Sequence, residues 1–171
     1  MLKLLMVVVL GALGAVATAS ESGRTPLPAP RFGEIRDVTS TELGNFPYDP
    51  LLGGNIPADV LALSGLHVRL RGTVTPWDLD GEKVVRFALT DGQSCCFGGP
   101  PRIQHVVVVD FPAGMELTLA DGWVRVEGVL MVKEVRSSGL TQSLFSVVAS
   151  AVTASSAPPV TYISPPSPGR P

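Results

Sequence analysis

The sequence has little of what most enzymes use for chemistry. Its 171 residues include only two histidines and two cysteines. Two histidines leave little room for general acid–base catalysis, and their positions suggest no Ser-His-Asp arrangement. Gly98 and Gly99 are followed by no lysine and no helix, which excludes a phosphate-binding loop. These absences favour a protein without catalytic activity.

The sequence has no large excess of positive or negative charge. It also has almost no long hydrophobic runs. The chain carries 13 basic and 15 acidic residues. A nearly neutral chain offers no bulk attraction for nucleic acid or an anionic membrane, so we expect no nucleic-acid partner. One apolar run, from Leu4 to Val16, has about thirteen residues and is shorter than the roughly 20 needed to span a bilayer.

This run has the flanks of a secretory signal. Lys3 precedes it, and the small residues Ala17-Thr18-Ala19 follow it. We therefore predict a signal peptide over residues 1–19 and an exported protein, periplasmic or extracellular, without a membrane span once the signal is removed. The alternative is that the run is retained as a membrane anchor.

Both ends of the remaining chain are rich in proline. Residues 20–31 carry three prolines, and residues 154–171 carry six together with several serines. Such segments bury too little apolar surface to become ordered. We expect a leader or linker over residues 20–50, flexible up to residue 31, one β-domain over 51–153, and a disordered Pro-rich tail over 154–171.

Apolar and polar residues alternate in the middle of the chain, as is typical of β-strands. In residues 66–74, Leu66, Val68, Leu70 and Val74 fall on one face, and His67, Arg69, Arg71 and Thr73 fall on the other. Similar segments occupy residues 84–89, 104–111, 123–133 and 143–152. Residues 56–65 predict a short helical turn before the first strand, because proline opens this segment and glycine closes it.

Five short strands with a mid-strand glycine in the first and fourth favour a small barrel. Gly72 and Gly128 are the positions where such strands can bend sharply. We predict an all-β fold, a five-stranded barrel of the oligonucleotide/oligosaccharide-binding (OB) type. A different small barrel or a sandwich is the second choice, since residues 111–122 leave no room for the helix that OB folds often insert there.

The order of motifs resembles a family of exported bacterial domains of unknown function. The matching elements are Ile56-Pro57, Gly65 through Val68 to Gly72 and Pro76, Phe87-Ala88-Leu89, Cys95-Cys96-Phe97-Gly98, Val106 to Val109, and Val124-Arg125-Val126-Glu127-Gly128. The likeness covers residues 55–150, and its most specific element is the Cys-Cys-Phe-Gly loop. It implies an OB-like fold, no assigned reaction, and an association with envelope transport systems, including those for metals.

The sequence is compatible with four interpretations of Cys95 and Cys96. Adjacent cysteines can form a strained vicinal disulfide. They can bind Zn²⁺ or Cu⁺ together with His105 if the loop kinks, although no Cys-x-x-Cys spacing is present. One of them can act as a catalytic thiol with His105 as its base. In the fourth interpretation one cysteine packs into the barrel and the other is partly exposed, without further chemistry.

Four arginines and one tryptophan are the candidate ligand-binding residues. Arg69, Arg71, Arg86 and Arg125 are expected to face outward on three strands and could form a basic stripe for a polyanion. Interleaved with Glu127, the same residues could equally form an ordinary solvated face. Trp77 is expected in the loop after the first strand, where OB folds often bind ligands, with plain packing as its alternative.

The sequence therefore predicts a non-enzymatic module of the periplasm or cell envelope that binds a ligand or assists another protein. Its expected partners are envelope transport components or another envelope protein, and no cofactor is expected. The competing hypothesis is a thiol-dependent or metal-dependent protein that uses Zn or Cu at Cys95, Cys96 and His105. A third is a structural envelope protein whose barrel binds another polypeptide.

Overall fold

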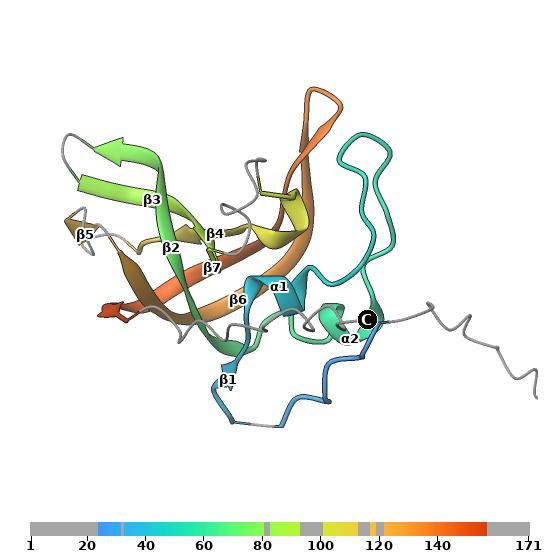
Figure 1. The fold of residues 1–171 in the computed structure, drawn as a ribbon, viewed down its shortest axis with the longest axis horizontal. Helices are drawn as coiled ribbons and strands as arrows, with labels where there is room; N and C mark the ends of the chain where they lie inside the picture. Colours follow the sequence, from blue (N-terminus) through green and yellow to red (C-terminus); the bar gives the residue numbers. More distant parts are fainter. Residues whose placement is uncertain are drawn as a thin grey trace, which may run out of the picture.

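A computed structural model describes residues 24–31, 33–80, 83–92, 101–112, 117–118 and 122–156. Strands dominate this part of the chain (Figure 1). In chain order the elements are β1 (Arg36–Asp37), α1 (Ser40–Leu43), α2 (Ala58–Leu61), β2 (His67–Asp80), β3 (Lys83–Thr90), η1 (Ile103–His105), β4 (Val107–Asp110), β5 (Leu117–Thr118), β6 (Trp123–Ser137) and β7 (Leu140–Ser155). Among the described residues, no helix is long and apolar enough to cross a membrane.

Five strands close into a ring of hydrogen-bonded pairs. β2 pairs antiparallel with both β3 and β6, β6 pairs antiparallel with β7, and β4 pairs antiparallel with β3. The parallel pairing of β4 with β7 closes the ring. Each of the five predicted strands overlaps one of these, so the predicted all-β fold is confirmed, and the ring fits an OB-like barrel. The predicted helical turn before the first strand is also present, as α2.

The interior of the ring is filled by alternate residues of each strand. The predicted inward residues Val68, Leu70, Val124, Val126 and Leu130 are buried, as the period of two requires. The largest fully buried side chains include Phe87 on β3 and Phe145 on β7, and they lie among valines and leucines from all five strands. A single continuous core therefore holds the barrel together.

Two strands run further than the sequence indicates. β2 continues to Asp80 instead of ending near residue 74, and the β6–β7 hairpin extends to Ser137 and Leu140. Near Trp77 the pairing of β2 with β3 shifts between Pro76 and Asp78, which is a β-bulge. Trp77 therefore lies within a strand, and its expected place in the loop after the first strand is wrong.

The segment before α2 belongs to the packed unit, although the sequence assigned residues 20–50 to a leader. Val38, Leu43 and Phe46 are buried in the core, and the Phe46 and Phe145 rings meet edge to face with centroids 6.5 Å apart. α1 is stabilised by a capping box in which Thr39 and Glu42 exchange hydrogen bonds. The packed part of the chain thus starts before the predicted boundary at residue 51.

Residues 24–31 also make defined contacts, in contrast to the flexible leader that we expected there. The Arg24 guanidinium donates to both carboxylate oxygens of Asp59 on α2, each over 2.8 Å. The backbone amide of Leu27 donates to the same carboxylate over 2.6 Å. The hydrogen bond from Arg24 is the main cause that lowers the pKa of Asp59 below its usual value of 3.8. This segment is therefore held against α2.

Loss of this ion pair is expected to destabilise the fold. We expect Arg24→Ala to lower the free energy of unfolding by about 2 kcal/mol, the usual worth of hydrogen bonds to a charged group. Because the folded-state pKa of Asp59 is lowered, its contribution is complete above about pH 4 and is lost as the pH falls through the folded value. Urea unfolding across the acid range measures both effects. Arg31→Ala, which removes an exposed arginine of the same segment, is the matched control. An equal loss in this control would contradict the role of the pair.

Four polar side chains connect the outer part of the β6–β7 hairpin to the segment that follows α1. We call Tyr48, Glu134, Arg136 and Thr141 the hairpin clamp. The Tyr48 hydroxyl, Arg136 Nη1 and Thr141 Oγ1 all donate to Glu134 Oε1, over 2.6, 2.7 and 2.9 Å. These hydrogen bonds, that of Tyr48 first, lower the pKa of Glu134. Glu134 therefore stays ionised and bonded within the clamp at neutral pH.

Candidate binding face on strands β2 and β6

The pairing of β2 with β6 brings three of the predicted arginines onto one outer surface. Arg69 lies opposite Glu127, and Arg71 lies opposite Arg125. The residues between them in each strand, such as Leu70 and Val126, point into the core, so these four side chains share the solvent side. We call the outer surface formed by Arg69, Arg71, Arg125 and Glu127 the β2–β6 face.

Arg69 is already neutralised. Its Nε donates to Glu127 Oε1 over 2.7 Å, and its Nη1 lies 3.4 Å from Asp37 Oδ2 on β1. The hydrogen bond with Glu127 is the main cause that raises the pKa of the Arg69 guanidinium. Arg69 therefore has little charge left with which to attract a ligand.

Arg71 and Arg125 are placed differently, because each faces the other. Side chains directly opposite on paired strands have Cβ atoms about 5 Å apart, and like charges there destabilise a sheet. Within the part of the chain that the structure describes, neither forms an ion pair. Arg71 is exposed and Arg125 is half-buried, with an Nε that has no hydrogen-bond partner in the structure. On this face, Arg71 and Arg125 therefore carry positive charge that no carboxylate of the described residues compensates.

The surroundings of the pair offer hydroxyl groups and one aromatic ring. Trp123 is half-buried next to Gly92, and Thr73 lies opposite it on β2. Thr73 Oγ1 is 3.2 Å from Thr90 Oγ1, and Thr153 of β7 lies opposite Arg125. A ligand with an anionic group at the arginines would therefore meet hydroxyls and an indole ring beside it.

Arg86 and Trp77 lie elsewhere, so the single stripe expected from the sequence does not form. Arg86 is paired with Asp110 on β4, with Nε and Oδ1 2.5 Å apart. In register it lies opposite Asp78, seven residues along β2 from Arg71, or about 23 Å at the usual rise per residue. Trp77 is exposed in the bulge next to that position. Of the five predicted ligand-binding residues, three lie together on the β2–β6 face: Arg69, Arg71 and Arg125. Arg86 and Trp77 lie away from this face.

The predicted metal ligands are only partly described. Cys95 and Cys96 lie outside the described residues, and the structure places His105 alone, in η1. The His105 ring packs close to Gly44, since a Cβ added there would lie 2.4 Å from its Cδ2. Within the described ranges no group of three or more metal-binding side chains comes together.

Residues near α1 contact the chain on both sides of the segment that contains the two cysteines. The sequence did not predict these contacts. Before that segment, the Asp91 amide donates to Ser40 Oγ over 3.1 Å, and the Thr41 hydroxyl donates to the Asp91 carboxylate. After it, the backbone of Gln104 lies against Gly44. The pattern Thr39-x-x-Glu42 before an apolar residue was the available signal, because it is a helix-start signature.

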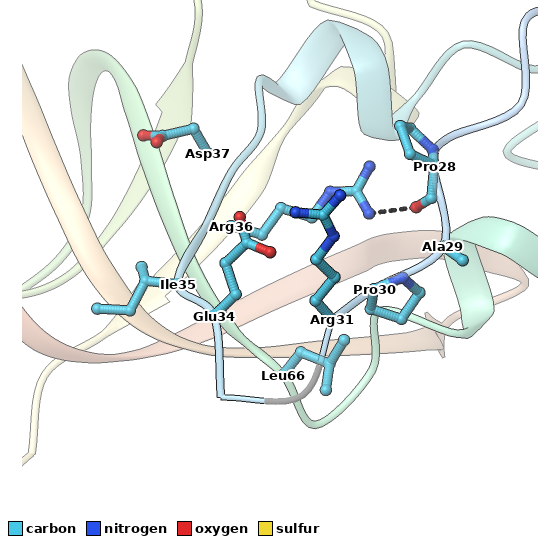
Figure 2. Close-up of a pocket in the computed structure, with 9 residues that line it drawn as sticks. All are labelled: Pro28, Ala29, Pro30, Arg31, Glu34, Ile35, Arg36, Asp37 and Leu66. Atoms are coloured by element: carbon cyan, nitrogen blue, oxygen red, sulfur yellow. Dashed lines mark hydrogen bonds between the residues drawn. The ribbon is translucent and has the colours of Figure 1, made fainter.

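One cavity of about 480 Å³ lies between residues 28–37 and the start of β2. Its lining consists of Pro28, Ala29, Pro30, Arg31, Glu34, Ile35, Arg36, Asp37 and Leu66 (Figure 2). Arg36 donates to the carbonyl of Pro28 across it. Its two arginines are matched by two carboxylates, so the lining carries no net charge. The cavity therefore has no excess positive charge for an anion, in contrast to the β2–β6 face.

Comparison with known proteins shows a similarity of fold to solved structures. No family model matches the chain, and no curated protein matches it. A DUF3299 family protein from Pseudomonas aeruginosa, solved as a crystal structure, is similar with a TM-score of 0.52 and 19% identity. The match covers 72% of this chain and 97% of that one. At this level of identity the match supports the fold alone.

A putative aspartyl-tRNA synthetase from Leishmania major is similar more remotely, with a TM-score of 0.42 and 13% identity. That match covers 76% of this chain but 22% of the synthetase. A likeness at this level carries no argument about this protein.

Proposed function

We propose that the chain is a non-enzymatic, exported binding or accessory module of the cell envelope, and that Arg71 and Arg125 bind an acidic segment of another envelope protein. The observation that carries this proposal is the pair itself. Two like charges directly opposite each other cost stability, and departures of this kind are expected at functional sites. A carboxylate between the two guanidiniums would remove the repulsion. Export and envelope location rest on the signal-like start of the sequence.

An acidic polypeptide fits this face better than a nucleic acid does. Guanidinium groups present a planar fork that binds carboxylates through two hydrogen bonds. A polynucleotide would need a longer row of free cations and several stacking rings. Arg69 and Arg86 are occupied by carboxylates, and the net formal charge of the chain is −2. The available charge is therefore local and suits a ligand with a few carboxylates.

Arg71→Ala is expected to weaken binding of a fluorescein-labelled oligo-glutamate peptide about tenfold, because a hydrogen-bonded charge contact is lost. Fluorescence anisotropy at low and at physiological salt measures this, and the affinity of the unsubstituted chain should fall as salt rises. In the same variant we expect the free energy of unfolding to be unchanged or raised by about 0.5 kcal/mol, because the repulsion is relieved.

Arg86→Ala is the matched control, since it removes an exposed arginine whose charge Asp110 already compensates. It should leave peptide binding unchanged. An equal loss of binding in both variants would indicate a general charge effect and contradict the assignment. Binding without salt dependence, or single-stranded DNA of equal charge bound more tightly than the peptide, would contradict the proposed partner.

A further inference from the structure

Three apolar side chains lie next to one another on the outer surface of β6 and β7. Val129 of β6 is directly opposite Val148 of β7, and Met131 is two residues further along β6. Their neighbours Leu130 and Val147 are buried in the core, so the period of two places all three on the solvent side. Opposite side chains on paired strands have Cβ atoms about 5 Å apart. We call Val129, Met131 and Val148 the apolar patch.

The apolar patch differs from the rest of the surface to which it belongs. Met131 is 43% exposed, Val148 is 50% exposed, and Val129 is half-buried. A sheet that packs one side on a core usually carries polar residues on its other side. The outward positions of β2 follow this rule: His67, Arg69, Arg71 and Thr73. Apolar side chains that are exposed together, and not singly, are typical of a contact surface.

The apolar patch continues the β2–β6 face, because β6 lies between β2 and β7 in the sheet (Figure 1). Arg125 and Val129 are four residues apart on β6, and Met131 is two residues further. At the usual rise per residue these separations are about 13 and 20 Å. One outer surface therefore carries the uncompensated arginine pair at one end and an apolar contact area at the other.

The charges that border the apolar patch are paired with each other. Arg69 and Glu127, which lie between the patch and the arginine pair, form an ion pair of 2.7 Å. On the β4 side, Asp110 lies opposite Val148 and is paired with Arg86. Paired charges cost less to cover than single ones. A partner can therefore cover the patch without removing an isolated charge from water at either of these borders.

We propose that the acidic segment bound by Arg71 and Arg125 also carries apolar side chains about 13–20 Å from its carboxylates, and that these side chains bind the apolar patch. An extended polypeptide covers these distances in four to six residues. The charge of the arginine pair calls for carboxylates, and a polyanion without apolar groups would leave the patch in water. This inference rests on the proposed function and specifies which acidic segments the face selects.

Three amidated, fluorescein-labelled peptides test the spacing. The spaced peptide is Glu-Glu-Gly-Ser-Gly-Leu-Ser-Leu, with leucines four and six positions after the second glutamate. The serine peptide has serine in place of both leucines, and in the adjacent peptide the leucines directly follow the glutamates. Fluorescence anisotropy with the full chain at low salt should show the spaced peptide bound about tenfold more tightly than the other two. Partial burial of two leucines stabilises a complex by about that factor.

Substitutions in the patch identify where the leucines bind. Met131→Ser with Val148→Ser in one chain should abolish the preference for the spaced peptide and leave the affinity for the serine peptide unchanged. Leu52→Ser with Leu140→Ser is the matched control, because it removes two exposed leucines near the outer end of the β6–β7 hairpin. Leu140 lies opposite Ser137, six residues beyond Met131 on β6. The control should keep the full preference.

The outcomes distinguish this inference from the proposed function. Suppose that the serine peptide or oligo-glutamate binds through Arg71 and the spaced peptide binds no more tightly than the serine peptide. The inference is then overturned, and the proposed function stands. A preference that survives Met131→Ser with Val148→Ser, or that is lost equally in the control, also overturns it. Equal affinity for the adjacent peptide would contradict the separation of 13–20 Å. Binding of none of the peptides, oligo-glutamate included, would overturn both proposals.

Discussion

A chain that begins at Leu51 is expected to be unfolded at room temperature. Deleting the preceding residues removes Val38, Leu43 and Phe46 from the core. Full burial of such side chains contributes about 1.5–3 kcal/mol each, so the loss is about 5–9 kcal/mol. That loss is comparable with the whole stability of a typical domain, about 5–15 kcal/mol. Circular dichroism during thermal and urea unfolding measures it.

A chain that begins at Arg24 is the control for this deletion, because it keeps every contact that the structure describes. It should unfold cooperatively. Leu43→Ala and Phe46→Ala in the full chain should each lower the free energy of unfolding by about 2–5 kcal/mol. A cooperative transition in the chain that begins at Leu51 would mean that the barrel forms without the N-terminal segment, which contradicts the role given to α1.

Gly128→Ala is the second substitution expected to have a large effect. A Cβ added at Gly128 would lie 2.2 Å from the Val148 carbonyl oxygen and 2.7 Å from Val147 Cγ1. The first of these atoms belongs to the backbone of the neighbouring strand, so it cannot move without disrupting the β6–β7 ladder. We expect a loss of about 3 kcal/mol or more in the free energy of unfolding, measured in urea.

Gly72→Ala should behave in the same way, because its Cβ would lie 2.2 Å from the Thr90 carbonyl oxygen. Met131→Ala on β6 is the matched control, since that side chain is exposed and surface substitutions usually change stability by no more than about 0.5 kcal/mol. If Gly128→Ala were as mild as this control, the close approach of β6 and β7 would be contradicted.

The barrel strands were predictable because their burial pattern is local. Alternation along residues 66–74 and 123–133 already separates inner from outer positions. Gly72 and Gly128 were predicted only as positions where the strands can bend, and the structure adds that a neighbouring strand comes close to each of them. The extensions of β2 and of the β6–β7 hairpin were not predictable in this way. They are set by pairing with a neighbouring strand, and their outer residues no longer alternate against a core.

The sequence does not predict the role of the N-terminal segment, because the prolines of residues 20–31 favour a flexible leader even though a helix-start signal follows them. Residues 20–31 contain three prolines, yet Arg24 reaches Asp59, which is 35 positions away. The capping box at Thr39 and Glu42 was readable, but the sequence does not show that Leu43 and Phe46 then meet a barrel formed later in the chain.

The candidate site was only half predictable, for a related reason. The sequence indicates that Arg69, Arg71, Arg86 and Arg125 face outward, but strand register decides which of them meets a carboxylate. Register places Glu127 opposite Arg69 and Asp110 opposite Arg86, and it leaves Arg71 opposite Arg125. The four arginines therefore look equivalent in sequence and are not equivalent in the folded protein.

The contacts of the N-terminal segment also set the order in which the protein can fold. Ser40 bonds to Asp91 across 51 positions, and Phe46 meets Phe145 on the last strand, 99 positions later (145 − 46). β4 likewise cannot complete its pairing until β7, its parallel neighbour, is present. Such a topology has a high contact order, which places its folding time in the range of milliseconds to seconds. Until β7 has been synthesised, Leu43 and Phe46 have no complete core to enter, so the nascent chain exposes them up to that point.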